Sequence, residues 1–91
     1  MSNLKEFKVT YDQRADVLYI SKRSEVSTKG IEDRYGLVWR YKDGELISAT
    51  IVDFLDYWHD KHELLARELS KKFDIPQNQA ETVLNHVQRD R

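Results

Sequence analysis

The hydrophobic pattern changes its period at Asp53, and this change constrains the fold more than any other feature of the sequence. Before this residue, apolar and polar side chains alternate, as in Phe7–Tyr11, which is typical of half-buried strands. After it, core-type side chains recur every three or four residues, which is typical of an amphipathic helix: Phe54, Trp58, His62, Leu65 and Leu69. The sequence therefore predicts an α+β chain, with its strands before its helices.

Polar and turn-forming segments divide the first half into about four strands. The segment Asp43-Gly44 is a strong hairpin signal, because glycine tolerates the positive φ of a tight turn. The polar segment from Ser21 to Asp33 predicts a loop, with a short edge strand near Val26 as an option. We expect an antiparallel β-meander with strands near residues 7–11, 17–20, 35–41 and 45–52.

Two helices are expected after the meander. Asp53 or Asp56 is placed to cap the first helix, which should end near Phe73 because Pro76 cannot continue it. Asp74 then resembles the start of a capping box for the second helix, whose apolar stripe is Ala80, Val83, Leu84 and Val87. We expect a single domain over residues 1–91, with the β-meander in 1–53 and a two-helix extension in 54–91.

Composition excludes several classes of protein. The chain has 91 residues, of which 40% are hydrophobic and 34% charged, so it is apolar enough to fold. Its net charge of -1 gives no global positive field for nucleic acid. The lack of cysteine excludes disulfides and thiolate chemistry. No apolar run resembles a signal peptide or membrane span, so we expect a cytoplasmic protein without membrane contact.

No pattern of an enzyme is visible, and no cofactor is expected. His59 and Glu63 would lie one helical turn apart and could hold a metal ion, with His86 as a distant third ligand. A solvated helix face explains the same residues, and we favour it. Asp12 and Asp16 could form a carboxylate site, but both residue types also shape turns by accepting backbone N–H bonds, and we favour that role.

The C-terminal helix pair is similar to a helix-turn-helix. In that motif the second helix presents its N-terminal side chains to base edges, here Gln77, Asn78 and Gln79. Basic side chains for phosphate contacts would be Arg67, Lys71 and Lys72. The usual turn glycine is missing, and helices that pack on a sheet would give the same pattern. We favour packing and keep DNA binding as the alternative.

Aromatic side chains gather around the last hairpin and the first helix. Trp39, Tyr41, Tyr57 and Trp58 are enough to leave some of them at the surface as a contact for a protein partner. The two tryptophans would otherwise anchor the core, and both interpretations remain open. The edge strands of a meander can also pair with another chain, so we expect a homodimer.

The segment Val9–Ile20 contains a Tyr-Asp pair, an Ala-Asp pair and an apolar-Tyr-Ile strand. Further along come an acidic residue, a glycine-led strand, a hairpin turn and a last strand, at Glu32, Gly36–Val38, Asp43-Gly44 and Ile51-Val52. Over about the first sixty percent of the chain, this arrangement resembles a small bacterial family called domain of unknown function 2283. The resemblance implies a small meander fold with no established catalytic site.

The same resemblance implies a role in partner binding, because the genetic setting of some family members is that of partners of small ribonuclease-type toxins. Our leading hypothesis is a non-enzymatic protein-interaction module, the antitoxin-like member of a toxin–antitoxin pair. A DNA-binding transcriptional regulator is the alternative, and a metal-dependent enzyme is the third hypothesis.

Overall fold

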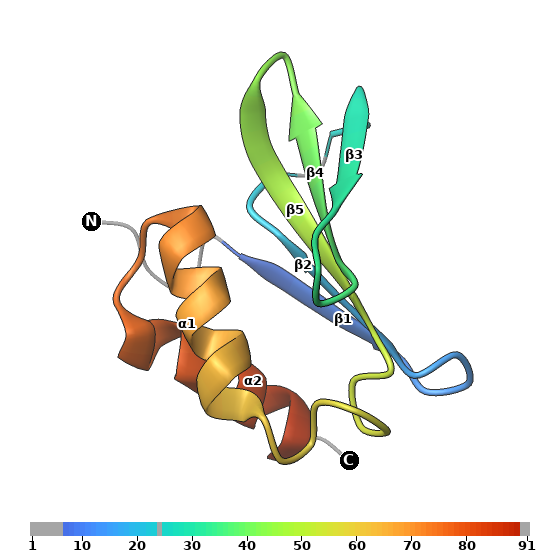
Figure 1. Cartoon of the computed structure of the whole chain (residues 1–91), viewed down its shortest axis with the longest axis vertical. Coiled ribbons are helices and arrows are strands. Elements are labelled where there is room, and N and C mark those ends of the chain that lie inside the picture. The colour runs from blue at the N-terminus through green and yellow to red at the C-terminus, as the bar shows by residue number, and fades with distance from the viewer. Residues whose placement is uncertain (1–6, 24, 90–91) are drawn as a thin grey trace.

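The computed structural model describes residues 7–23 and 25–89, with side chains described as far as residue 85. It contains a five-stranded antiparallel sheet followed by two helices (Figure 1). The strands are β1 (Lys8–Asp12), β2 (Val17–Ser21), β3 (Lys29–Glu32), β4 (Leu37–Lys42) and β5 (Glu45–Val52). The helices are α1 (His62–Phe73) and α2 (Gln77–Arg89). The predicted α+β class, with its strands before its helices, is confirmed.

The strand order is β1-β2-β5-β4-β3, which is not the order of a simple meander. The segment after β2 carries the chain past the place that β5 later fills, so the last strand of the sequence becomes the central strand. Leu18, Ile51 and Leu37 lie in one row across β2, β5 and β4. Apolar side chains on both neighbours favour this position for the mostly buried β5.

The fifth strand was expected only as an option near Val26, and the structure places it at Lys29–Glu32. All four of its residues are exposed, and Ile31 lies opposite Trp39 on β4. A single apolar residue cannot produce an alternating pattern, which explains why the sequence signal was weak.

Both helices cover the same face of the sheet, and the shared layer forms one hydrophobic cluster (Figure 1). Trp39, Leu65 and Leu84 are among its fully buried side chains and come from β4, α1 and α2. Phe73 on α1 contacts Trp39 edge to face, with 6.2 Å between ring centroids. Because this face of the sheet is apolar, it needs the helices to exclude water from it.

The predicted start of the first helix was wrong. Residues 54–60 form consecutive turns, and α1 begins at His62 with Lys61 as a cap residue that makes no side-chain cap bond. Asp53 has a φ of 56° and accepts the backbone N–H groups of Tyr57 and Trp58 with its carbonyl oxygen. Neither predicted cap starts a helix, although Trp58 is still buried. None of the described helices is long and apolar enough to cross a membrane.

The predicted end of the first helix was right, but the role assigned to Asp74 was wrong. Asp74 ends α1 in the left-handed conformation, at φ 58° and ψ 52°, and its N–H group donates to Ser70 O. It therefore replaces the glycine that commonly ends a helix. The second helix begins after Pro76, whose carbonyl oxygen accepts the N–H groups of Gln79 and Ala80.

Candidate protein-binding surface

The densest polar contact joins the β1–β2 turn to the chain that follows β5. Asp16 Oδ1 accepts the N–H of Leu55 at 2.9 Å and the hydroxyl of Tyr11 at 2.6 Å. Its Oδ2 accepts the N–H of Asp56 at 3.0 Å, and its carbonyl oxygen accepts that of Phe54 at 3.1 Å. Both carboxylate oxygens thus hold backbone 39 and 40 residues away, which supports a structural role for this motif.

Two more carboxylates hold turns in the same way. Asp12 Oδ1 accepts the N–H groups of Arg14 and Ala15, at 3.1 and 3.2 Å. Asp33 accepts the N–H groups of Tyr35 and Leu37 with Oδ1, and the indole N–H of Trp39 with Oδ2 at 2.9 Å. Asp33 thus uses both of its carboxylate oxygens, and Asp12 one of them, to hold backbone or indole donors. This engagement supports the turn-forming role that we favoured for Asp12 over a carboxylate site.

The predicted metal pair loses its geometric basis. His59 lies in the turns before α1, whereas Glu63 is in the first turn of the helix, so the two are not one helical turn apart. Among the described residues, no group of three histidine or acidic side chains is placed to hold a metal ion. The third predicted ligand, His86, lies outside the residues whose side chains are described.

His62 lies at the first position of α1, where its ring stacks on Phe54 with 5.4 Å between centroids. Burial lowers the pKa of His62, and the charge of His59 lowers it further. His62 also borders an open depression of about 210 Å³ with Glu63, Glu81 and Asn85. This arrangement favours a neutral imidazole packed on Phe54.

The residues predicted to contact DNA lie around the junction of α1 and α2. Arg67, Lys71, Lys72 and Asn78 are exposed, while Gln77 and Gln79 are half-buried. Lys71 pairs with Glu68 at 3.6 Å and Arg67 with Glu63 at 4.0 Å.

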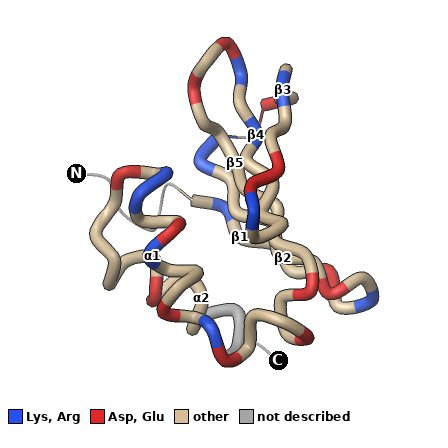
Figure 2. Tube along the Cα trace, in the orientation of Figure 1, with Lys and Arg blue, Asp and Glu red and all other residues tan. Residues whose placement is uncertain are grey.

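Figure 2 shows these basic positions interleaved with acidic ones along α1. The Nζ of Lys72 lies 5.5 Å from the centre of the Trp39 ring. Gln77 donates to Glu81 at 3.3 Å, which engages its side chain within α2. In the described part of the helix pair, acidic side chains thus pair with two of the three basic ones predicted to contact phosphates.

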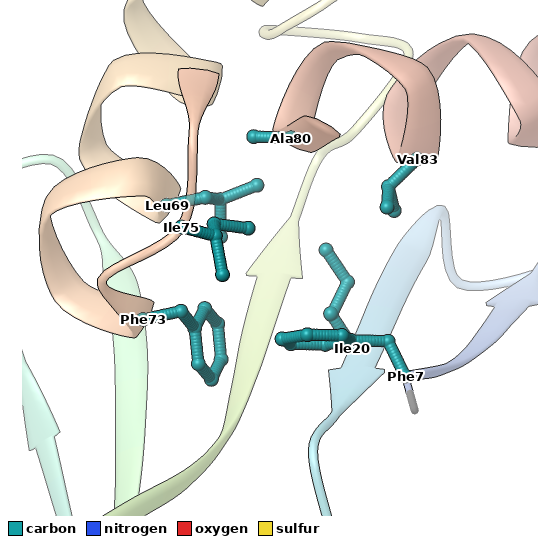
Figure 3. Close-up of a pocket in the computed structure, with 7 residues that line it drawn as sticks. All are labelled: Phe7, Ile20, Leu69, Phe73, Ile75, Ala80 and Val83. Carbon is teal, nitrogen blue, oxygen red and sulfur yellow. The ribbon is translucent and has the colours of Figure 1, made fainter. Parts of the chain in front are cut away.

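A small apolar gap lies where the helix pair meets β2, lined by Phe7, Ile20, Leu69, Phe73, Ile75, Ala80 and Val83 (Figure 3). The aromatic rings of Phe7 and Phe73 meet edge to face across it, 5.2 Å apart. Its volume is about 10 Å³, which is at the lower limit for one water molecule, and its lining is apolar. The gap is a packing feature and offers no ligand site.

The four predicted partner-binding aromatics are mostly inside the molecule. Trp39 and Trp58 are each 1% exposed, so burial supports their role as core anchors. Tyr41 is half-buried against the core. Tyr57 is 46% exposed and lies beneath Lys61, whose Nζ is 4.2 Å from the ring centre. Of the four, only Tyr57 is exposed.

A second group of exposed apolar side chains lies on the face of the sheet opposite the helices, which the helices leave uncovered (Figure 1). Tyr19, Thr50 and Val38 form one row across β2, β5 and β4, and Val17 pairs with Val52 in the row beside it. We call these five residues the open-face strip. Tyr19 is 40% and Val52 42% exposed, whereas Thr50 is 7% exposed between its neighbours.

The sequence of β2 contains a sign of this strip that our prediction missed. Val17, Leu18, Tyr19 and Ile20 are all apolar, without the alternation that a half-wet strand shows. Leu18 and Ile20 face the helices, so Val17 and Tyr19 must face the other way. A continuous apolar run predicts a strand that is buried on both faces, but in this chain the helices cover only one face of β2.

The fold thus defines a small α+β protein with a five-stranded antiparallel sheet, in which Asp12, Asp16 and Asp33 are engaged in turns. Residues 8–54 match the family described as protein of unknown function (DUF2283). This match covers just over half of the 91 residues, so the chain belongs to this family. It contains the whole sheet and ends before the helices. Neither curated proteins nor solved structures gave a match.

Proposed function

We propose that this protein is a non-enzymatic protein-interaction module that binds its partner through the open-face strip. The observation that carries the proposal is the uncovered apolar area around Tyr19 and Val52, each at least 40% exposed on a regular sheet. Adjacent exposed apolar side chains on a rigid element favour association, because burying them removes apolar area from water. An exposed sheet face suits a folded protein surface better than a small ligand, because small ligands favour concave pockets.

We further propose that the partner is a small toxin, which would make this chain the antitoxin-like member of a pair. Support comes from the family resemblance, which implies partners of the small-toxin type, and from the engagement of Asp12, Asp16 and Asp33 in turns, which suits a role without chemistry. A protein that blocks a toxin by covering it needs a contact surface and no chemistry of its own. The open-face strip would supply that surface.

The test is capture of partners from native lysate with the tagged chain, followed by titration of the purified partner. Tyr19→Lys and Val52→Lys place charges on the open-face strip and should each weaken binding by tenfold or more, because a charge is then buried at the contact. Tyr57→Ser is the matched control, since it removes an exposed aromatic elsewhere. Equal binding by all three variants would contradict the proposal.

DNA binding through the helix pair is a second candidate. The observation in its favour is the short connection of Asp74–Pro76, with Asn78 exposed at the start of α2. Gel shifts with the upstream DNA of the gene should then show binding that falls steeply with salt and is lost in Asn78→Ala. The absence of binding at low salt would exclude this function.

A further inference from the structure

Strand β3 leaves one edge of the sheet unpaired, because β4 is its only neighbour in the described sheet. The N–H of Asp33 donates to Leu37 O at 2.9 Å, and this bond shows which residues of β3 point their backbone groups toward β4 and which point them outward. In an antiparallel ladder, alternate residues point their backbone groups to the same side. The backbone groups of Lys29 and Ile31 therefore bond toward β4, and those of Gly30 and Glu32 point outward.

We propose that β3 pairs with β3 of a second copy of this chain, antiparallel and centred on Ile31. A twofold axis perpendicular to the sheet requires paired residues to share a face. With Ile31 opposite its own copy, Gly30 lies opposite Glu32 of the second copy, and the reverse. Each such pair would exchange two backbone hydrogen bonds between the outward-pointing groups. In this register the two residues that pair, Gly30 and Glu32, are those whose backbone groups point away from β4.

The side chains suit this register on the face away from the helices. Arg40 lies beside Gly30, with a guanidinium nitrogen 3.5 Å from the position of a Cβ on that glycine. Among the described residues, no carboxylate pairs with Arg40, whose Nε donates to Thr50 Oγ1 at 3.1 Å. Because Gly30 has no side chain, Glu32 of the second copy could reach Arg40 directly.

The helix-side face of the same edge is also complementary. Ile31 is 43% exposed and would bury its side chain against the Ile31 of the second copy. Lys29 would lie opposite Asp33 of the second copy, whose carboxylate stays bonded to Tyr35, Leu37 and Trp39, so the two attract as opposite charges without a direct bond. Exposed charges often protect an edge strand from pairing, but in this register Glu32 faces Arg40 of the second copy and Lys29 faces Asp33.

The dimer would place both open-face strips on the same side of one continuous sheet. The pairing is independent of the proposed function, since it uses the β3 edge and not the strip. A monomer that still binds a partner, or a dimer that binds none, would separate the two ideas.

The test is sedimentation velocity of the full chain over a hundredfold concentration range reaching about 1 mM, because an interface of this size is expected to be weak. We expect a monomer–dimer equilibrium. Glu32→Lys and Arg40→Glu should each weaken dimerisation by tenfold or more, because each homodimer then places like charges together. Glu63→Lys, an exposed change on α1, is the charge-matched control and should leave the dimer intact.

Mixing Glu32→Lys with Arg40→Glu should restore dimerisation as a heterodimer, because opposite charges again meet at both ends of the contact. Rescue by mixing separates a specific contact from loss of folding, and thermal unfolding by circular dichroism verifies that each variant is folded. A chain that stays monomeric throughout the range, or a dimer that tolerates both substitutions, would overturn the proposal.

Discussion

At the scale of single residues, aspartate holds every non-glycine position of positive φ in the described chain: Asp16, Asp43, Asp53 and Asp74. Aspartate tolerates the left-handed conformation better than most residues, and its carboxylate can accept nearby N–H groups. Asp16 combines both properties, with a φ of 59° and bonds to Tyr11, Leu55 and Asp56. The Tyr-Asp and Ala-Asp pairs of the family motif therefore specify the fold.

Asp16→Ala should lower the free energy of unfolding by about 3 kcal/mol, because it leaves two backbone N–H groups without their charged acceptor. Urea denaturation would measure the change. The control Asp60→Ala removes an exposed ion pair with Lys61 and should change the free energy of unfolding far less, because solvent screens such a pair. Equal effects of the two substitutions would show that the Asp16 contacts contribute little.

His62 gives the stability a dependence on pH. Its pKa in the folded chain is lowered from 6.5 by burial and then by the charge of His59. Protonation therefore favours the unfolded chain, so the contribution of neutral His62 is complete above pH 6.5 and decreases as pH falls through the folded-state pKa. In urea titrations from pH 7.5 to 5, His62→Gln should lose less stability than the parent chain. Parallel losses would contradict this assignment.

At the scale of elements, the end of α1 shows how one residue fixes a helix boundary. Asp74→Gly should raise the free energy of unfolding by up to about 1 kcal/mol, because glycine adopts the left-handed conformation without a Cβ penalty. Asp74→Val should lower it by about 1 kcal/mol or more, since a β-branched residue is strained there. Thermal unfolding of both variants provides the measurement, and a change of the same sign in both would contradict it.

Elements with a strong periodic pattern were predicted correctly, and elements set by distant contacts were not. The hairpin at Asp43-Gly44 and the end of α1 before Pro76 follow from local chemistry. The start of α1 does not, because Asp16 binds the N–H groups of Leu55 and Asp56 from another part of the chain. Phe54 and Trp58 lie four residues apart on consecutive turns and are both buried. Because turns can bury residues at the same spacing as a helix, the spacing did not distinguish the two structures.

The candidate surface was predicted less well than the fold. Trp39 was predicted as a possible partner contact because its aromatic side chain is large. The same size makes an aromatic residue an effective core anchor, and Trp39 is buried. The exposure of Tyr19 depends on which face of β2 the helices cover, and the sequence alone does not state this. The central place of β5 likewise depends on long-range pairing, which local patterns do not encode.

At the scale of the whole molecule, the helices outside the family segment complete the core of that segment. Leu18, Leu37 and Ile51 on the sheet share one cluster with Leu65 and Leu84 on the helices. The sheet by itself would expose this apolar face to water. The two-helix extension is therefore an integral layer of the fold.

A fragment ending at residue 61 should consequently lack a cooperative unfolding transition. Removal of both helices would expose Trp39, which is 1% exposed in the whole chain. Its fluorescence should shift to longer wavelength, and the fragment should bind a hydrophobic dye, because the sheet then has no covered face. A sharp transition close to that of the whole chain would contradict this prediction.

The central position of β5 has a consequence for how the chain folds during synthesis. The β1–β2 hairpin can form early, but β2 gains its second neighbour only when residues 48–52 have been made. The bonds from Leu55 and Asp56 to Asp16 close later still. Loops of this length must close before their contacts give any stability, which slows folding. We therefore expect the nascent chain to acquire its native sheet late, in a single step of long-range closure.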